Sequence, residues 1–178
     1  MWPANIAPAR QGETTMATRP SADDLKRHWG LAEMQTERVW FHQTYIDPKA
    51  GPEGRPLSSA IIALVTNDAA MFSDMHRLPT DELWLFHLGD PIELLLLHPD
   101  GRDELVVLGP DVLGGQVIQH VVPAGTWMGA RLRPGGEYGV WGNTMAPGYA
   151  ISDFDGADAA DLIARWPHRA ELITALTR

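Results

Sequence analysis

The feature that most constrains the fold is a series of short apolar runs between Val39 and Glu137, separated by turn residues. The turns are explicit at Pro99-Asp100-Gly101, at Gly114-Gly115 and at Pro134-Gly135-Gly136. Many short strands at fairly even spacing predict an all-β sandwich or barrel. The predicted strands span residues 39–45, 59–65, 71–76, 83–87, 92–98, 104–108, 119–122, 128–133 and 138–144.

Both ends of this β region have helical patterns. Ser21 is a capping residue before acidic residues, and Leu25 and Trp29 fall on one helical face. Residues 156–177 return to helical periodicity, and Pro167 divides that stretch into two short helices. We expect these C-terminal helices to pack on the outside of the barrel.

The length of 178 residues favours one domain with a conventional core. Residues 1–20 are rich in Pro, Ala and Thr and predict a flexible tail, which leaves 21–178 as a single domain that includes the C-terminal helices. The native start could be Met1 or Met16. The N-terminus lacks a secretory pattern, and the longest apolar run, near 94–97, is too short for a bilayer, so we expect no membrane partner and a cytoplasmic location.

Charge and cysteine content exclude several classes of function. The formal net charge is −9 and no basic patch stands out, so we expect no nucleic acid partner. The chain has no cysteine, which rules out disulfides and thiolate metal sites. Small uncharged or cationic ligands remain compatible with this composition.

The stretch HRLPTDELWLFHLGDP, residues 76–91, carries the most chemical information. His76 and Glu82 lie six residues apart, so the two side chains can face the same side of a sheet. The Pro79-Thr80 pair lets the chain turn between them, and Gly89 precedes another turn. The segment predicts a polar pair at the mouth of a small barrel.

The spacing H-x5-E-x6-G in this stretch, with PAGTW at residues 123–127, resembles the motifs of the cupin superfamily. The ordered runs FSDMHRLPTDELWLFHLGDPIELLLLHPDG, VVLGPDVLGGQ, VVPAGTWMGARL and APGYAISDFD are similar to one cupin family, cupin_5 or DUF985. The resemblance covers the chain from about Leu31 onward. It implies an all-β cupin jelly roll, or double-stranded β-helix, that usually forms a homodimer, and it does not fix a reaction.

The resemblance also indicates where a metal would bind. Metal-binding cupins usually supply two histidines and the glutamate from the first motif and a histidine from the second. His76 and Glu82 match two of these positions, whereas Leu78 and Met128 occupy the other two. A thioether is a poor ligand for Fe, Mn, Zn or Ni. We therefore expect no tightly bound metal, although His76 and Glu82 could bind a divalent ion weakly.

The candidate substrate-binding residues are mostly apolar. Strand parity places Trp84 and Phe86 on the side of Glu82, and the second motif supplies the opposite wall. The family commonly has a HPEGGY-like segment before the first strand, of which this chain keeps a glutamate and an aromatic residue. The candidates are Trp84, Phe86, Trp127, Met128, Leu78, Trp40 and Glu37.

The leading functional hypothesis is proton transfer on a small organic substrate: isomerisation, epimerisation, cyclisation or elimination. His76 is the candidate base, and Glu82 orients it or returns the proton. Tyr45 is a candidate acid, because related sugar epimerases with this barrel pair a histidine base with a tyrosine acid. One alternative is a small-molecule binding protein without chemistry, and another is a metal-dependent cupin oxygenase. A purely structural hydrogen bond between His76 and Glu82 is also open.

Overall fold

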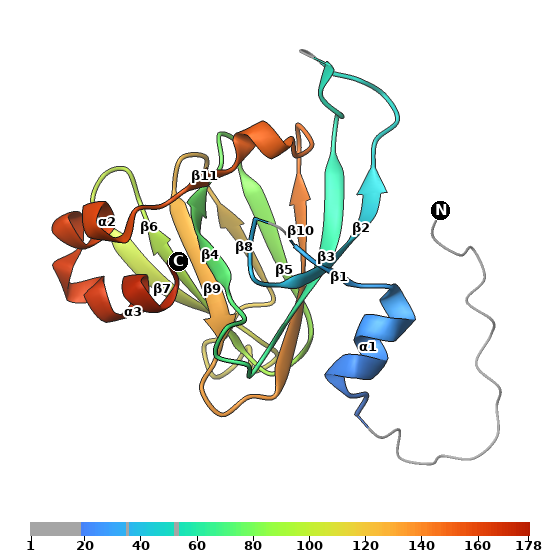
Figure 1. The fold of residues 1–178 in the computed structure, drawn as a ribbon, viewed down its shortest axis with the longest axis horizontal. Coiled ribbons are helices and arrows are strands. Elements are labelled where there is room, and N and C mark those ends of the chain that lie inside the picture. Colours follow the sequence, from blue (N-terminus) through green and yellow to red (C-terminus); the bar gives the residue numbers. More distant parts are fainter. Residues whose placement is uncertain (1–18, 35, 52–53) are drawn as a thin grey trace.

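The computed structural model describes residues 19–34, 36–51 and 54–178 and consists of two antiparallel sheets that face each other (Figure 1). One sheet has six strands in the order β1-β2-β3-β10-β5-β8. These are β1 (Ala32–Glu33), β2 (Trp40–Ile46), β3 (Ser59–Thr66), β10 (Tyr138–Met145), β5 (Glu82–Gly89) and β8 (Gln119–Val122). The second sheet has the order β11-β4-β9-β6-β7, with β11 (Asp155–Gly156), β4 (Ser73–Arg77), β9 (Trp127–Leu132), β6 (Ile92–Leu97) and β7 (Asp103–Leu108).

The nine predicted strands are confirmed, and most of their ends shift by one or two residues. The prediction 119–122 matches β8 at both ends. The two-residue strands β1 and β11 were not predicted, because two residues are too few to show a period. The predicted all-β architecture with short helices at both ends is therefore present.

Side-chain alternation builds a core on each face of the sheets. The run Ile92–Leu97 on β6 shows this clearly. Leu94 and Leu96 point between the sheets, whereas Leu95 and Leu97 point outward into a second apolar cluster. Because residues 94–97 of β6 are buried on both faces, this part of the strand is apolar without interruption.

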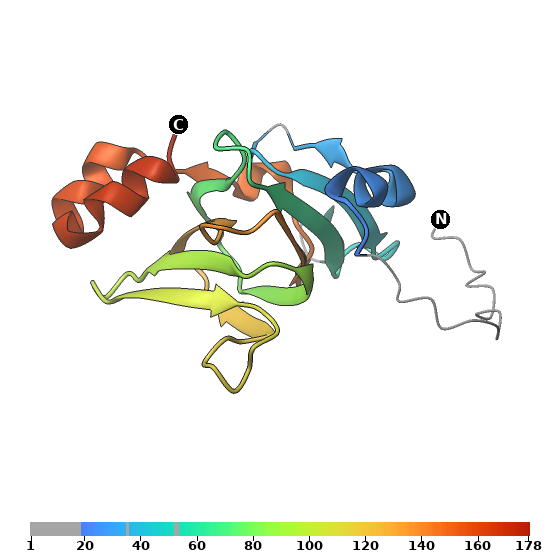
Figure 2. The same ribbon diagram turned by 90° about the horizontal axis from the view of Figure 1, so that it is seen from below.

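Helix α1 (Ala22–Trp29) covers the outer face of the six-stranded sheet (Figure 2). Ser21 caps the helix and forms a reciprocal capping box with Asp24. Gly30 ends it with a φ of 61°, a left-handed conformation that favours glycine. Leu25 is buried against the sheet, which confirms the predicted N-terminal helix.

The C-terminal part crosses the open end of the sandwich and then covers the five-stranded sheet (Figure 1). It contains η2 (Ile151–Asp153), β11, α2 (Ala159–Arg165), η3 (Pro167–Arg169) and α3 (Ala170–Ala175). Trp166 and Ile173 are buried against the outward side chains of β6. The predicted division at Pro167 and the position outside the barrel are both confirmed.

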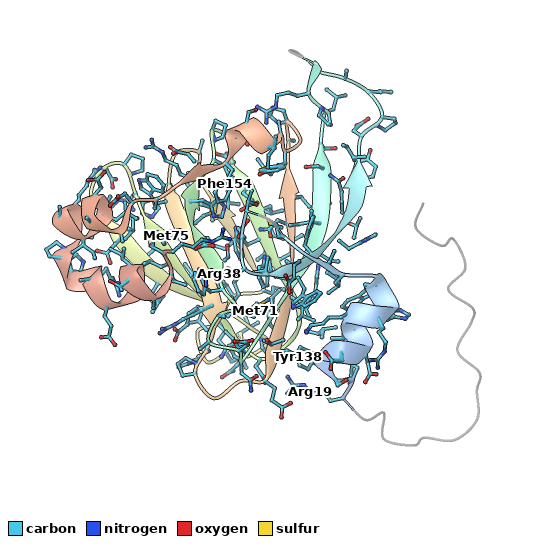
Figure 3. The ribbon with its side chains drawn as sticks, in the orientation of Figure 1. Arg19, Arg38, Met71, Met75, Tyr138 and Phe154 are labelled. Atoms are coloured by element: carbon cyan, nitrogen blue, oxygen red, sulfur yellow. The ribbon has the colours of Figure 1, made fainter. Side chains whose placement is uncertain are left out.

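A flexible tail was predicted for residues 1–20, of which residues 1–18 lie outside the described residues. Arg19 is described, and its guanidinium donates two hydrogen bonds to the carboxylate of Asp90, at 3.1 and 2.6 Å. It also lies 4.4 Å from the ring centre of Tyr138, next to which Figure 3 labels it. Within the described ranges, no helix is long and apolar enough to cross a membrane.

Candidate functional site

A cavity of about 460 Å³ opens at the end of the sandwich where η2 crosses. Its walls come from the strands β2, β3, β4, β5 and β10 and from the segment after β10. His76, Leu78 and Glu82 line it, and so does Glu37 from the segment before β2. A smaller chamber of about 20 Å³ lies among His76, Glu82, Trp84, Trp141 and Asn143.

The His76 ring is held in one orientation by its backbone neighbour and by an aromatic ring. Its Nδ1 lies 2.7 Å from the carbonyl oxygen of Asp74. A carbonyl oxygen only accepts, so Nδ1 carries the hydrogen and Nε2 is the nitrogen that can take up a proton. Phe154 stacks on the imidazole with ring centres 5.0 Å apart, and Figure 3 labels Phe154 where the segment after η2 crosses the sheets. His76 is buried, with 4% of its surface exposed.

Glu82, the first residue of β5, is buried beside His76. Its Oε2 accepts a hydrogen bond of 2.7 Å from the indole Nε1 of Trp84, two residues along the same strand. Desolvation raises the pKa of Glu82 to about 7, although the positive charge available on His76 opposes that rise. At neutral pH the carboxyl group is therefore divided between its acid and its base forms, which suits proton transfer.

A second Trp-to-polar contact lies on the neighbouring strand. Asn143 on β10 accepts a hydrogen bond of 2.6 Å at Oδ1 from the indole Nε1 of Trp141. Trp84 and Trp141 stack with ring centres 5.3 Å apart and an angle of 8° between their planes. The stacked pair thus positions both Glu82 and Asn143.

Two further polar residues line the cavity. Glu37 accepts a hydrogen bond from the Ser73 hydroxyl. Desolvation, together with the negative charges of Glu37 and Asp153, raises the pKa of Tyr149 to about 12. Tyr149 therefore keeps its phenolic hydrogen at neutral pH and can donate it in a hydrogen bond.

Tyr45 does not line the cavity, which corrects the expectation that it could act as the acid. A β-bulge between Gln43 and Tyr45 makes Tyr45 pair with Ala60, whereas Gln43 pairs with Ile61. Gln43 and Ile61 line the cavity. Because the bulge shifts the alternation, Tyr45 lies on the other face and is 48% exposed.

Trp127 and Trp40 also lie away from the cavity. Trp127 is on the outer face of β9 with the guanidinium of Arg77 4.6 Å from its ring centre. Trp40 has the opposite parity to Phe41, so it packs on the outer face beside α1. The prediction that Trp127 and Trp40 line the cavity was therefore wrong. Their neighbours in the sequence, Met128 and Phe41, face inward instead.

The remaining predicted residues face the interior of the sandwich. Leu78 and Glu37 line the cavity, and Trp84 bounds the small chamber. Met128, the register partner of His76, and Phe86 lie in the core between the sheets without lining either space.

The donor set at the cupin metal position fits a metal poorly. His76 and Glu82 are present, but Leu78 contributes only carbon and Met128 only a thioether. Among the residues that the structure describes, no group of three or more His, Cys, Asp or Glu side chains is placed to hold a metal ion.

Several residues of the site were missed in the sequence, among them Asn143, Tyr149 and Phe154. Asn143 could have been found from its parity with Trp141 in the run YGVWGNTM. Tyr149 and Phe154 lie in a segment without a period of two, and they reach the cavity because β11 pairs with β4 at His76 and Arg77. No local signal predicts that pairing.

Comparisons with known proteins agree with this architecture. Protein SO0799 from Shewanella oneidensis is 28% identical, with a TM-score of 0.82 over 90% of this chain and 99% of that one. A hypothetical protein from Leishmania major is 24% identical, with a TM-score of 0.77 over 89% and 99%. A cupin 2 domain-containing protein from Halorhodospira halophila, 15% identical with a TM-score of 0.53 over 83% and 87%, shares the fold.

No protein of curated function matches the chain. The family model described as cupin superfamily, Cupin_5 (DUF985), matches residues 23–157. These residues include β4 and β5, which carry His76 and Glu82, and the whole of β10. Since the match spans most of the chain, the protein belongs to the Cupin_5 (DUF985) family of the cupin superfamily.

Proposed function

We propose that this cupin is an enzyme that transfers protons on a small organic substrate inside its apolar cavity, without a tightly bound metal. The observation that carries the proposal is the buried pair of His76 and Glu82, in which burial raises the pKa of the carboxyl group to about 7. A carboxyl group with this pKa can both give and take a proton at neutral pH. The reaction class is isomerisation, epimerisation, cyclisation or elimination.

His76 is the base in this scheme. Its Nδ1 hydrogen is engaged by the Asp74 carbonyl, so the lone pair of Nε2 takes the proton from carbon. The stacked ring of Phe154 and the bonded Nδ1 hold the imidazole in place, which reduces the cost of orienting it for each turnover.

Glu82 is the second proton carrier. In its neutral form it donates a proton to the substrate, and in its ionised form it stabilises the imidazolium on His76. Tyr149 replaces Tyr45 as the candidate phenolic donor, because its pKa of about 12 keeps the hydroxyl protonated and it lines the cavity. The cavity of about 460 Å³ has the size typical of small-molecule sites.

The rival function is a binding protein that holds the same class of molecule without converting it. The same cavity and the same apolar walls support both functions. What favours the enzyme is the ionisable pair itself, because a carboxyl group with a pKa of about 7 beside an imidazole can exchange protons at neutral pH, which binding alone does not require.

Solvent deuterium provides a test that needs no known substrate. The purified protein is incubated in heavy water with a small-metabolite extract, and the metabolites are then compared by mass spectrometry. We expect the wild type to add deuterium to a carbon position of at least one metabolite. His76→Ala should slow this incorporation by about 10² to 10⁴, and Glu82→Gln should slow it less.

His28→Ala is the matched control, because His28 is exposed on α1 and is not one of the residues that line the cavity. It should incorporate deuterium at the wild-type rate. If His76→Ala and Glu82→Gln retain the full rate, the acid–base assignment is wrong. If the wild type labels no metabolite but retains one through gel filtration, the binding-protein function takes its place.

A further inference from the structure

The side chain of Asn143 presents a hydrogen-bond donor that the protein does not use. It is 6% exposed. An indole N–H can only donate, so the atom facing Trp141 must be the amide oxygen, which fixes the amide orientation. Nδ2 is then directed away from Trp141, and no acceptor within hydrogen-bond distance is found for it among the described residues. Buried polar groups of this kind are uncommon and call for an explanation.

The position of this donor connects it to the proposed proton carriers. Asn143 lines the main cavity, and with His76 and Glu82 it also encloses the small chamber behind it. A volume of about 20 Å³ has room for one oxygen-sized group. An oxygen atom placed there would lie between the Asn143 amide and the two titratable side chains.

The charge of the cavity limits what can enter. Three of the described residues that line it carry carboxyl groups: Glu33, Glu37 and Glu82. No Lys or Arg is among the described lining residues. The rest of the lining is largely apolar, with Phe41, Ile61 and other hydrophobic side chains. A carboxylate or phosphate on the ligand would be repelled and would lose its hydration without gaining a cationic partner.

We propose that the ligand is an uncharged or cationic carbonyl compound whose oxygen accepts a hydrogen bond from Asn143 Nδ2. This inference uses the same site as the proposed function and narrows its substrate class. Asn143 then becomes a catalytic residue, because it contacts the atom on which charge develops.

The step that follows is an enolisation. The C–H bond next to the carbonyl breaks, its proton passes to His76 Nε2, and its electron pair forms a C=C bond as the carbonyl π electrons move to oxygen. The negative charge on that oxygen is stabilised by the Asn143 donor, which needs no reorientation. Return of a proton to the same or to a neighbouring carbon completes the reaction. The proton comes from His76, or from neutral Glu82, in which case the proton held on His76 then passes to the Glu82 carboxylate.

The ligand class can be measured without knowing the natural substrate. Three probes of similar size are α-tetralone, its hydrocarbon counterpart tetralin and the anion tetrahydronaphthoate. In ¹H–¹⁵N spectra of the full chain, the Asn143 side-chain amide signal is assigned by its loss in Asn143→Asp. We expect saturable movement of this signal with α-tetralone, and binding of tetrahydronaphthoate at least tenfold weaker.

Asn143→Asp keeps the oxygen that accepts from Trp141 and removes the amide donor, so at pH 8 it should bind α-tetralone at least tenfold more weakly, about 1.4 kcal/mol. The carboxyl group introduced by Asn143→Asp could still donate a hydrogen bond if it were protonated. Asn143→Ala excludes this donor and should show the same loss of affinity. Asn67→Asp, at an exposed bend, makes the same chemical change elsewhere and should bind like the wild type. Tetralin affinity should be the same in all four proteins.

A titration in which α-tetralone leaves the Asn143 signal unmoved, or in which tetrahydronaphthoate binds as tightly as the ketone, would overturn the proposal. Exchange of the α-protons of bound α-tetralone in heavy water tests the proton-transfer function separately. If the ketone binds through Asn143 but His76→Ala does not slow its exchange, the ligand class stands and the acid–base function fails. If His76→Ala slows exchange and Asn143→Asp does not, the role of Asn143 fails alone.

Discussion

Trp84 and Trp141 stack face to face, with ring centres 5.3 Å apart, and each donates its indole hydrogen to the polar residue two positions away on its own strand. Trp84 donates to Glu82 and Trp141 donates to Asn143. Both tryptophans are buried, each with 2% of its surface exposed. The stacked tryptophans of the core are therefore hydrogen-bonded directly to polar groups of the cavity. A substitution that changes the packing of either indole also changes the environment of Glu82 or Asn143.

This coupling predicts the effect of Trp84→Phe. Phenylalanine keeps a ring for stacking on Trp141 but cannot donate to Glu82. In the wild type, the hydrogen bond from Trp84 lowers the pKa of the Glu82 carboxyl group. We therefore expect the pKa of Glu82 to rise further, measured from its ¹³C carboxyl shift. The loss of stability should be about 1 to 3 kcal/mol at pH 8, where the carboxylate is charged and loses its partner.

The contrast variant is Trp84→Ala. It removes the same donor and also opens a cavity in the core, so we expect a larger loss, of about 3 to 5 kcal/mol, at pH 8. An unchanged Glu82 pKa in Trp84→Phe would show that the indole hydrogen bond has no electrostatic role.

The raised pKa of Glu82 also predicts how stability depends on pH. The ordinary value of 4.5 applies to the unfolded chain, and burial raises the folded pKa to about 7. The penalty for the buried charge is absent below pH 4.5, grows between 4.5 and 7 and is complete above 7. Its size follows from the shift and is on the order of 3 kcal/mol.

Glu82→Gln removes this titration while it keeps an oxygen for Trp84. The free energy of unfolding of the variant minus that of the wild type should therefore rise as pH increases from 4.5 to 7 and then level off. Urea denaturation at fixed pH steps measures this difference, in which the titration of other groups cancels. A difference that stays constant with pH would mean that Glu82 ionises at its ordinary pH.

Strand alternation explains how much of the fold and the site could be predicted. His76, Glu82 and Trp84 were placed inside from a period of two, and each lies inside. The same rule failed at Tyr45 because a bulge adds one residue to β2, and Thr44, in the shifted stretch, instead bonds to the Ala60 carbonyl through its hydroxyl. A bulge carries little local sequence signal, since Thr44 would fit a regular strand equally well.

The mouth of the cavity could not be predicted for a different reason. Phe154 reaches His76 only because Asp155 and Gly156 pair with Arg77 and His76 across a separation of almost half the chain. Such a contact depends on where the rest of the chain has already placed β4. Sequence periodicity describes one element at a time, so it contains no information about this pairing.

The assembly gives a further prediction. We propose a homodimer that joins along β8, which is an edge strand of the six-stranded sheet. Exposed apolar residues gather on and before this strand, including Leu113, which is fully exposed, Ile118 at 56% and Val121 at 48%. An uncovered apolar edge favours pairing with another copy of the chain.

Sedimentation at micromolar concentration should give the mass of a dimer, and Leu113→Asp combined with Val121→Lys should give a monomer. Leu57→Asp is the control, because Leu57 is also exposed, at 43%, but lies between β2 and β3. A monomeric wild type would contradict the proposed homodimer. Dissociation by Leu57→Asp would instead place the interface on the other side of the sheet.

The last prediction concerns metal and uses the two apolar positions of the cupin ligand set. Leu78 lines the cavity, and Met128 is the register partner of His76. Wild-type protein dialysed against chelator should carry well under one equivalent of Fe, Mn, Ni or Zn, since two protein ligands hold a divalent ion weakly.

Leu78→His with Met128→His would complete a set of three imidazoles and one carboxylate, which suits these ions. The double variant should bind about one equivalent of Zn, measured by elemental analysis, and should gain thermal stability when the metal is added, because a ligand that binds the native state stabilises it. Leu78→His alone has three ligands and should bind more weakly. Stoichiometric metal in the wild type would instead mean that other side chains supply the missing ligands, and it would favour the metal-dependent alternative over metal-free proton transfer.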